Sequence, residues 1–337
     1  MAITTKELAA LAGVSRGTVD RALHHRGGVH PDVQKRIEAL AKEHGYSPNR
    51  AGKALVMRSP IRIAVLLQSV GNPFFNEVKT GLQRAVLEYP DFRIHIELKE
   101  AKGYSYEKQL ALISDVQSDG LDGLLLTPIS HPEVAARLEK LNTRGIPVIA
   151  LNNDISAKRL CYVGCDYLRS GQTAAQMLGL LCGGEGSVAA VTGSLSMLGH
   201  RQRIEGFRQV MAEEFPGITV AEIAENNDDD AESAKIVSDI MNRVHPRGLY
   251  FGAAGAAAGA RQAKELASGP LSIVVSDPIP EIRDLIHDNI VQAAIGQQPE
   301  EQGYQAMRLM IEHLIFHTKP AQDCIYTQNE IKIKTNL

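Results

Sequence analysis

From residue 61 to the C-terminus, short apolar runs alternate with stretches of helical periodicity. Most runs are followed by about 12–20 residues with apolar positions at helical spacing, the pattern of a mostly parallel sheet covered by helices. The number of predicted strands suits two doubly wound sheets better than one. We therefore predict an α/β fold with two subdomains. The runs with the length and composition of buried strands are 61–68, 93–98, 121–128, 146–153, 186–193, 217–223, 247–252, 271–277 and 289–295.

The first 60 residues differ from this body in charge. They contain ten Lys or Arg against five Asp or Glu, whereas the other 277 residues contain 26 against 34. A small basic head on a larger acidic body predicts a nucleic-acid-binding module joined to a domain with another task.

Three short helices are predicted in the head. Thr4 and Glu7 have the spacing of a capping box, and an apolar stripe at Leu8, Leu11 and Ala12 follows. Gly13 ends this helix, and Ser15 can cap a second one that runs from Arg16 to about Leu23. A third begins at Pro31, with Gly45 as its C-terminal cap. Two helices joined by a turn with glycine form a helix-turn-helix, although an ordinary helical cap on a larger domain is the alternative.

The runs TTKELAALAGVSRGTVDRAL and GYSPNRAGKAL resemble the head of the LacI (lac repressor) family of bacterial transcription regulators. The resemblance implies a DNA-binding head over 1–47 and a hinge over 48–60. It implies that the second helix enters the major groove, where an arginine fork matches guanine O6 and N7. Asp20 departs from the family and either accepts from a cytosine or pairs with Arg21 in solvent. The implied base-facing residues are Arg16, Gly17 and Arg21, and the implied phosphate contacts are Thr5, Ser15 and Thr18.

The run NRAGKALVMRS resembles the family's hinge helix, which lies in the minor groove. Leu55 would then be the apolar wedge that opens a base step, and Arg50 and Lys53 would lie near phosphates. Gly52 and the shortness of the segment make an isolated helix marginal. We therefore expect the hinge to be disordered without DNA and to fold on it; a plain flexible linker is the alternative.

The body, residues 61–337, resembles the sugar-binding fold shared by periplasmic binding proteins and LacI-family regulators. In that fold the chain crosses between two subdomains three times, here expected near 162–165, 290–293 and 321–326. The implied N-subdomain covers about 61–162 and 293–322, and the implied C-subdomain covers about 163–290 and 323–337.

The resemblance also implies a ligand site beyond the carboxyl ends of the strands. Asn72, Phe74 and Phe75 look like a sugar clamp; core packing is the alternative for each Phe. Arg201, the first arginine of RQRIEGF, would donate to ligand oxygens, and Asp277 would accept from hydroxyls. The remaining implied contacts are Thr127, Asn152, Asn153 and Gln297.

Departures from the family's ribose-binding members point away from ribose. Asn152 and Asn153 stand where those relatives carry an Asp-Arg pair, and Ala253 and Ala254 stand where they carry Asn-Asp. Asp228–Asp230, which we interpret as a solvated loop, stands at an aromatic position. The expected effector is therefore a sugar or related polyol of unspecified identity.

Other functional classes lack support in the sequence. No apolar run approaches the about 18–20 residues of a membrane span, and the N-terminus does not read as a secretory signal. The four cysteines have neither zinc nor redox-motif spacing, so we expect reduced thiols in the cytoplasm. No catalytic motif is recognised, and GAAGAAAGA lacks the dinucleotide spacing; we predict no enzyme activity, cofactor or metal.

The predicted function is a sequence-specific transcriptional regulator, a repressor. It would bind a pseudo-palindromic double-stranded DNA operator as a homodimer under control of a small-molecule effector. A sugar-binding receptor without a DNA role and a sequence-blind DNA binder are the alternatives.

Overall fold

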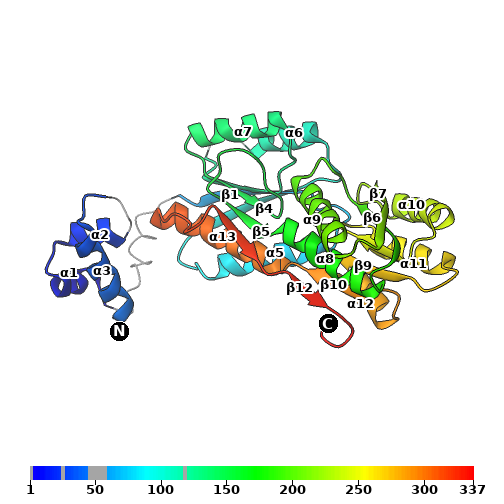
Figure 1. Ribbon diagram of the computed structural model, residues 1–337. Helices are drawn as coiled ribbons and strands as arrows, with labels where there is room; N and C mark the ends of the chain where they lie inside the picture. The colour runs from blue at the N-terminus through cyan, green and yellow to red at the C-terminus, as the bar shows by residue number, and fades with distance from the viewer. Residues whose placement is uncertain (1–2, 24–26, 45–58, 117–119) are drawn as a thin grey trace.

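The computed structural model describes residues 3–23, 27–44, 59–116 and 120–337 (Figure 1). The head contains α1 (Thr5–Ala12), α2 (Arg16–Leu23) and α3 (Pro31–Glu43). The predicted capping box is confirmed, since Thr4 Oγ1 accepts from Glu7 N at 3.3 Å and Glu7 Oε2 accepts from Thr4 N at 2.8 Å. Ser15 caps α2 by accepting from Thr18 N at 3.1 Å.

The core of the head is small and aliphatic. The buried residues are Leu8, Ala9, Ala12, Val19, Ala22, Ile37 and Ala41. The expectation that Leu11 belongs to this core is wrong, because its side chain is 53% exposed. Ala9 is buried instead. The buried face of α1 therefore consists of positions 8, 9 and 12, which lie on one side of a helix. The cap expected at Gly45 lies outside the described residues.

The body contains two six-stranded sheets. The first has the order β11-β5-β4-β3-β1-β2, and all its neighbouring strands are parallel. Its strands are β1 (Ile61–Leu67), β2 (Ile94–Glu100), β3 (Gly123–Leu126), β4 (Val148–Leu151), β5 (Cys161–Cys165) and β11 (Cys324–Thr327).

The second sheet has the order β12-β10-β9-β8-β6-β7, and only the β10–β12 pair is antiparallel. The α/β fold with two doubly wound sheets is therefore confirmed. Its strands are β6 (Gly186–Thr192), β7 (Ile218–Glu225), β8 (Gly248–Phe251), β9 (Ser272–Ser276), β10 (Ala293–Gly296) and β12 (Glu330–Lys332).

Helices cover both faces of each sheet. One face of the first sheet packs against α5 (Phe74–Leu87) and α13 (Pro299–Phe316), and the other against α6 (Tyr106–Val116) and α7 (Pro132–Thr143). The second sheet lies between α8 (Tyr167–Leu181) and α9 (Leu198–Glu214) on one face and three helices on the other. Those three are α10 (Asp230–Arg243), α11 (Ala256–Leu266) and α12 (Pro280–His287).

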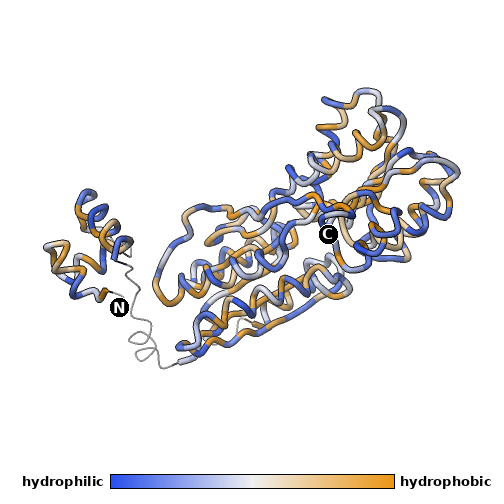
Figure 2. The backbone as a smooth tube through the Cα atoms, turned by 90° about the horizontal axis from the view of Figure 1, so that it is seen from below, coloured by the Kyte–Doolittle hydropathy of each residue, from blue (hydrophilic) through white to orange (hydrophobic). Residues whose placement is uncertain are grey.

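Hydrophobic and hydrophilic residues alternate along these helices in Figure 2, as expected where each helix buries one face. Two of the helix pairs approach unusually closely, and glycine permits the approach. A Cβ on Gly81 of α5 would lie 1.9 Å from the carbonyl oxygen of Glu300 near α13's start. A Cβ on Gly206 of α9 would lie 2.1 Å from the carbonyl oxygen of Leu168 on α8. Any larger residue at either position would therefore push the two helices apart.

The chain crosses between the sheets three times, each time later than expected. β5 and β11 belong to the first sheet and β10 to the second, so the crossings lie at 166, 297–298 and 328–329. The expected bounds at 162, 293 and 323 therefore assign most of β5, all of β10 and all of β11 to the wrong subdomain. The run CYVGC of β5 is too short to stand out as an apolar run, and it pairs between β4 and β11 with Cys161 and Val163 in the core beneath α13.

Candidate functional site

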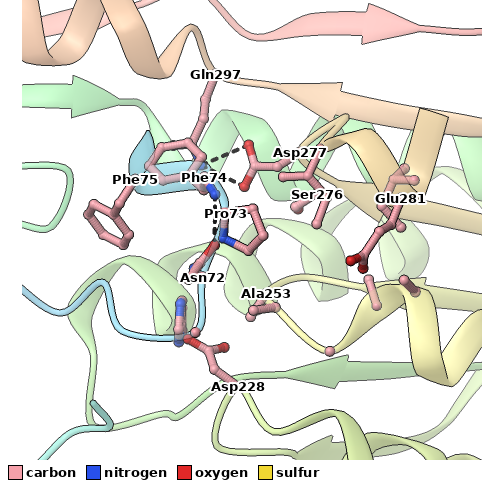
Figure 3. Close-up of a pocket in the computed structure, with 18 of the residues that line it drawn as sticks. Asn72, Pro73, Phe74, Phe75, Asp228, Ala253, Ser276, Asp277, Glu281 and Gln297 are labelled. Atoms are coloured by element: carbon pink, nitrogen blue, oxygen red, sulfur yellow. Dashed lines mark hydrogen bonds between the residues drawn. The ribbon is translucent and has the colours of Figure 1, made fainter. Parts of the chain in front are cut away.

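A cleft lies between the carboxyl ends of the two sheets, lined by loops from both subdomains (Figure 3). Among the predicted site residues, six line it: Asn72, Phe74, Phe75, Asn152, Asp277 and Gln297. They follow β1, β4, β9 and β10, as expected for a site beyond the carboxyl ends of parallel strands.

Phe74 and Phe75 form an apolar wall at the start of α5. Their rings meet edge to face with centroids 5.2 Å apart. Asn72 Oδ1 accepts from Phe74 N at 3.1 Å and so holds this turn. Both rings also belong to the core beneath the first sheet. Phe74 and Phe75 therefore line the cleft and pack in the core at the same time.

Asp277 and Gln297 form the best-defined polar pair in the cleft (Figure 3). Gln297 Nε2 donates to both carboxylate oxygens of Asp277, at 3.0 and 2.9 Å. Burial raises the pKa of Asp277 to about 6, against the opposing effects of the Arg203 guanidinium and the Gln297 amide. Asp277 has a φ of 67°, a left-handed backbone conformation that Asp tolerates better than most residues.

The arginine of the cleft is Arg203 and not Arg201, which corrects the sequence prediction. α9 turns about 100° per residue, so side chains two positions apart lie on nearly opposite faces. Arg201 is exposed and donates to the carbonyl oxygens of Leu195 and Ser196 at 2.6 and 3.2 Å. Arg203 lines the cleft and is only 2% exposed.

The guanidinium of Arg203 is only partly satisfied within the protein. It donates to the carbonyl oxygen of Gly252 and lies 4.6 Å from the centroid of the Tyr167 ring. Its Nε and Nη2 atoms are buried and have no hydrogen-bond partner among the described residues. Unmet donors on a buried charge are costly, and a ligand with acceptor oxygens would relieve that cost.

Two further predicted contacts do not line the cleft. Thr127 is buried, and its carbonyl oxygen accepts from Gln109 Nε2 at 2.9 Å. Asn153 uses both ends of its amide inside the protein, donating to the carbonyl oxygen of Pro128 at 2.6 Å and accepting from Gly199 N at 2.8 Å. The prediction that either side chain faces the cleft is therefore wrong, because both point into the packing beside it.

The Asn153 contact joins the two subdomains. α9 has no side-chain cap of its own, and its first backbone donors are satisfied from the first subdomain. Leu198 N donates to Ser130 Oγ at 3.1 Å, and Gly199 N donates to Asn153 Oδ1. The N-terminus of the helix that carries Arg203 is thus capped across the cleft.

A second contact closes the cleft at its other side. Tyr104, after β2, donates its hydroxyl to Asp228, after β7. β2 and β7 are the outer strands of their sheets, at the edges opposite the three crossings. The cleft is therefore bounded by crossings at one end and by this hydrogen bond at the other.

Sequence reasoning missed several cleft residues. Asp228 lines the cleft, which corrects the interpretation of this stretch as a solvated loop. His200 lines it too; burial lowers its pKa, and its Nδ1 lies 3.0 Å from Ser194 N and 3.1 Å from the carbonyl oxygen of Ser194. Asp228 lies in the loop after β7, a signal that the sequence offers, whereas His200 lies in the first turn of α9 and belongs to no recognised motif. Ala253 and Ala254 also line the cleft and supply no polar side-chain atom.

In the head, the predicted base-facing residues form an exposed surface at the start of α2. Arg16, Gly17 and Arg21 are exposed, and Thr5 and Thr18 are half-buried. Ser15 is exposed but already caps α2 and lies 2.9 Å from Thr18 Oγ1. Arg50, Lys53 and Leu55, with the predicted hinge helix, lie outside the described residues.

Comparison with known proteins identifies both parts of the chain. Residues 63–318 match the family model described as "Periplasmic binding protein domain". The chain belongs to this family. Residues 4–49 match the model "Bacterial regulatory proteins, lacI family", so the predicted resemblance of the head is also confirmed.

Proteins named as transcription regulators or repressors resemble the chain at low identity. The "HTH-type transcriptional regulator DegA" of Bacillus subtilis is 28% identical over 63% of this chain and 62% of its own length. A "Ribose operon repressor" of Halalkalibacterium halodurans is 25% identical over 82% of this chain and 81% of its own length. The chain thus matches somewhat less than two thirds of the first of these relatives.

A solved structure supports the fold. GanP, "a glucose-galactose binding protein from Geobacillus stearothermophilus", superposes with a TM-score of 0.77 at 21% identity, over 83% of this chain and 99% of GanP. In the described part of the chain, none of the helices is both long and apolar enough to cross a membrane.

Proposed function

We propose that this protein is a sequence-specific transcriptional regulator, a repressor, whose affinity for operator DNA is controlled by a sugar or polyol. The observation that carries the proposal is the combination of two sites in one chain. A helix-turn-helix with exposed arginines precedes a body whose cleft, between two subdomains, contains a buried and only partly satisfied guanidinium.

The head supplies the contacts to double-stranded DNA. Arg16 and Arg21 would read base edges in the major groove, with Gly17 allowing close approach, while Thr5, Ser15 and Thr18 contact phosphates. In the hinge, Leu55 would open a base step between phosphate contacts of Arg50 and Lys53. One head covers only a half-site, so we propose a homodimer on a pseudo-palindromic operator.

The cleft supplies the effector site. Phe74 and Phe75 would pack against the apolar face of a sugar ring, and Asn72 and Asn152 would hydrogen-bond its hydroxyls. Arg203 would donate its free Nε and Nη2 to neighbouring oxygens, and the Asp277–Gln297 pair would accept and donate beside them. We assign no catalytic step, metal or cofactor to this cleft, and we place the protein in the cytoplasm, where a regulator meets the chromosome.

Effector and operator would communicate through the subdomain angle. Ligand joining both walls of the cleft favours the closed arrangement, which changes the spacing of the paired hinges and hence their fit to the minor groove. The effector can shift operator affinity only by its difference in affinity for the two arrangements.

The proposal is tested in two steps with the purified full-length protein. A thermal-shift screen against sugars, polyols and their phosphates should reveal at least one compound that raises the melting temperature. A gel-shift assay on genomic fragments at fixed salt should then show a preferred fragment whose binding responds to that compound, and Arg16→Ala should lose this preference while keeping most non-specific binding.

Each contrary outcome has a distinct meaning. A sugar response without DNA binding would identify a solute-binding receptor, the alternative that the likeness to GanP supports. Binding of every fragment with equal affinity and a steep salt dependence would identify a sequence-blind DNA binder.

A further inference from the structure

Behind the cleft, outside its lining, lies the fully buried side chain of Gln302 on α13. Its Nε2 lies 2.9 Å from the carbonyl oxygen of Gln297, 3.2 Å from Gln297 Oε1 and 3.5 Å from Thr327 Oγ1. Its Oε1 accepts from Asn152 Nδ2 at 3.2 Å. One amide therefore contacts a cleft residue from the first subdomain and one from the crossing at 297–298.

A carboxamide has a donor end and an acceptor end. When Gln302 binds one end of the Asn152 or Gln297 amide, the other end of that amide is left to face its remaining neighbours. Because Gln302 Nε2 holds Gln297 Oε1, the Nε2 of Gln297 points to Asp277 and donates to both its oxygens. Because Gln302 Oε1 holds Asn152 Nδ2, the acceptor end of Asn152 is left for the cleft.

We propose that Gln302 is a positioning residue of the cleft. Its buried amide orients Asn152 and Gln297, and through Gln297 it keeps Asp277 a carboxylate that can accept from a ligand. Thr327 supports the same arrangement by donating its hydroxyl to the carbonyl oxygen of Gln297 at 2.8 Å. The role in effector binding rests on the proposed function, whereas the effect on Asp277 does not.

Other charged and titratable groups face Asp277 from the surrounding elements. Arg203 of α9 favours its carboxylate, whereas Glu77 of α5 and Asp228 after β7 oppose it, and burial opposes it most. Cys165, Tyr167 and Tyr250 also lie close enough to interact with it. The Gln297 amide donates to this carboxylate, and Gln302 holds the other end of the same amide.

The test is a titration of Asp277 in the full-length protein without ligand. Carboxyl carbons of ¹³C-labelled aspartate are followed by NMR, and the Asp277 signal is assigned by its loss in Asp277→Asn. Gln302→Met removes the donor that holds Gln297, so the Asp277 midpoint should rise from about 6 to about 7. Gln305→Met, on the same helix but outside this network, should leave the midpoint unchanged.

Gln297→Met should raise the midpoint at least as much, and adding Gln302→Met to it should raise the midpoint no further. An unchanged midpoint in folded Gln302→Met would overturn the proposal, as would a further rise in the double variant. If Gln302→Met does not fold, an unchanged midpoint in Gln297→Met overturns it equally, because Gln302 can reach Asp277 only through Gln297. The titration uses no effector, so a failed sugar screen would not affect its interpretation.

Discussion

Arg203 is the residue on which effector recognition is expected to depend. Arg203→Lys keeps the positive charge but loses the planar fork, so it should weaken the binding of the sugar found in the thermal-shift screen at least about tenfold. Arg201→Lys, two residues away on the opposite face of α9, is the matched control and should bind normally. Isothermal titration calorimetry measures the sugar affinity of both variants. Equal losses of affinity in the two variants would show that Arg203 does not contact the sugar.

Asp277 makes the stability of the protein depend on pH. Its pKa is raised to about 6, so the folded state holds this proton more tightly than the unfolded chain does. Its contribution to stability is therefore greatest below pH about 4 and is lost as the pH rises through about 6.

Asp277→Asn should consequently stabilise the fold at pH 7.5 by up to about 3 kcal/mol while abolishing effector binding. The gain should disappear near pH 4. Urea unfolding at several pH values measures this gain in the free energy of unfolding. Asp288→Asn, at an exposed position, is the control for the loss of one carboxylate. A gain that does not vary with pH would contradict this account.

The two arginines also show what sequence could predict at this scale. The run RQRIEGF correctly indicated that an arginine faces the cleft, but the choice between Arg201 and Arg203 depends on the rotation of α9. Arg203 lies four positions before the buried Phe207 and seven before Val210, which places it on the inner face. That signal was present in the sequence. The internal use of both ends of Asn153 was not, because it depends on the position of the other subdomain.

At the scale of elements, α9 connects the ligand site to the closure of the cleft. Its N-terminal donors are satisfied by Ser130 and Asn153 of the first subdomain, so opening the cleft exposes them. Asn153→Leu removes one acceptor, a loss of about 1 kcal/mol from the closed arrangement.

We expect Asn153→Leu to weaken effector binding about fivefold and to increase the radius of gyration measured by small-angle X-ray scattering. Asn142→Leu is a control, since that amide bonds within the first subdomain to Leu138 and Lys158. A radius of gyration that rises in the control as well would assign the effect to general destabilisation.

The strands show a similar division between what the sequence predicts and what only the assembled sheet reveals. All nine apolar runs contain strands, and most of these strands are buried in the described structure because helices cover both faces of the sheets. The three strands without a predicted run are β5, β11 and β12, of which only β11 and β12 lie at sheet edges. β11 and β12 are the outer strands next to the crossings, and their partly exposed residues carry no apolar run.

For the whole molecule, the proposed regulation requires reciprocity between its two ligands. If the effector changes operator affinity by some factor, saturating operator DNA must change effector affinity by the same factor. Fluorescence anisotropy with labelled operator and calorimetry with effector, in one buffer and at one salt concentration, measure the two factors. The proposed regulation predicts a factor clearly different from one in both titrations, and a factor of one in both would show that the two sites are not coupled.

The three crossings also determine the order in which the body can be completed during synthesis. The five parallel strands of the second sheet come from one uninterrupted stretch, 186–296, whereas the first sheet receives β11 only at 324–327. α13, which covers the same face of the first sheet as α5, is also made after the five parallel strands of the second sheet. A ribosome-bound chain thus holds an uncovered apolar surface while more than a hundred residues are added. This surface is where chaperones and misfolding would compete for the nascent protein, and where a truncated message would be most harmful.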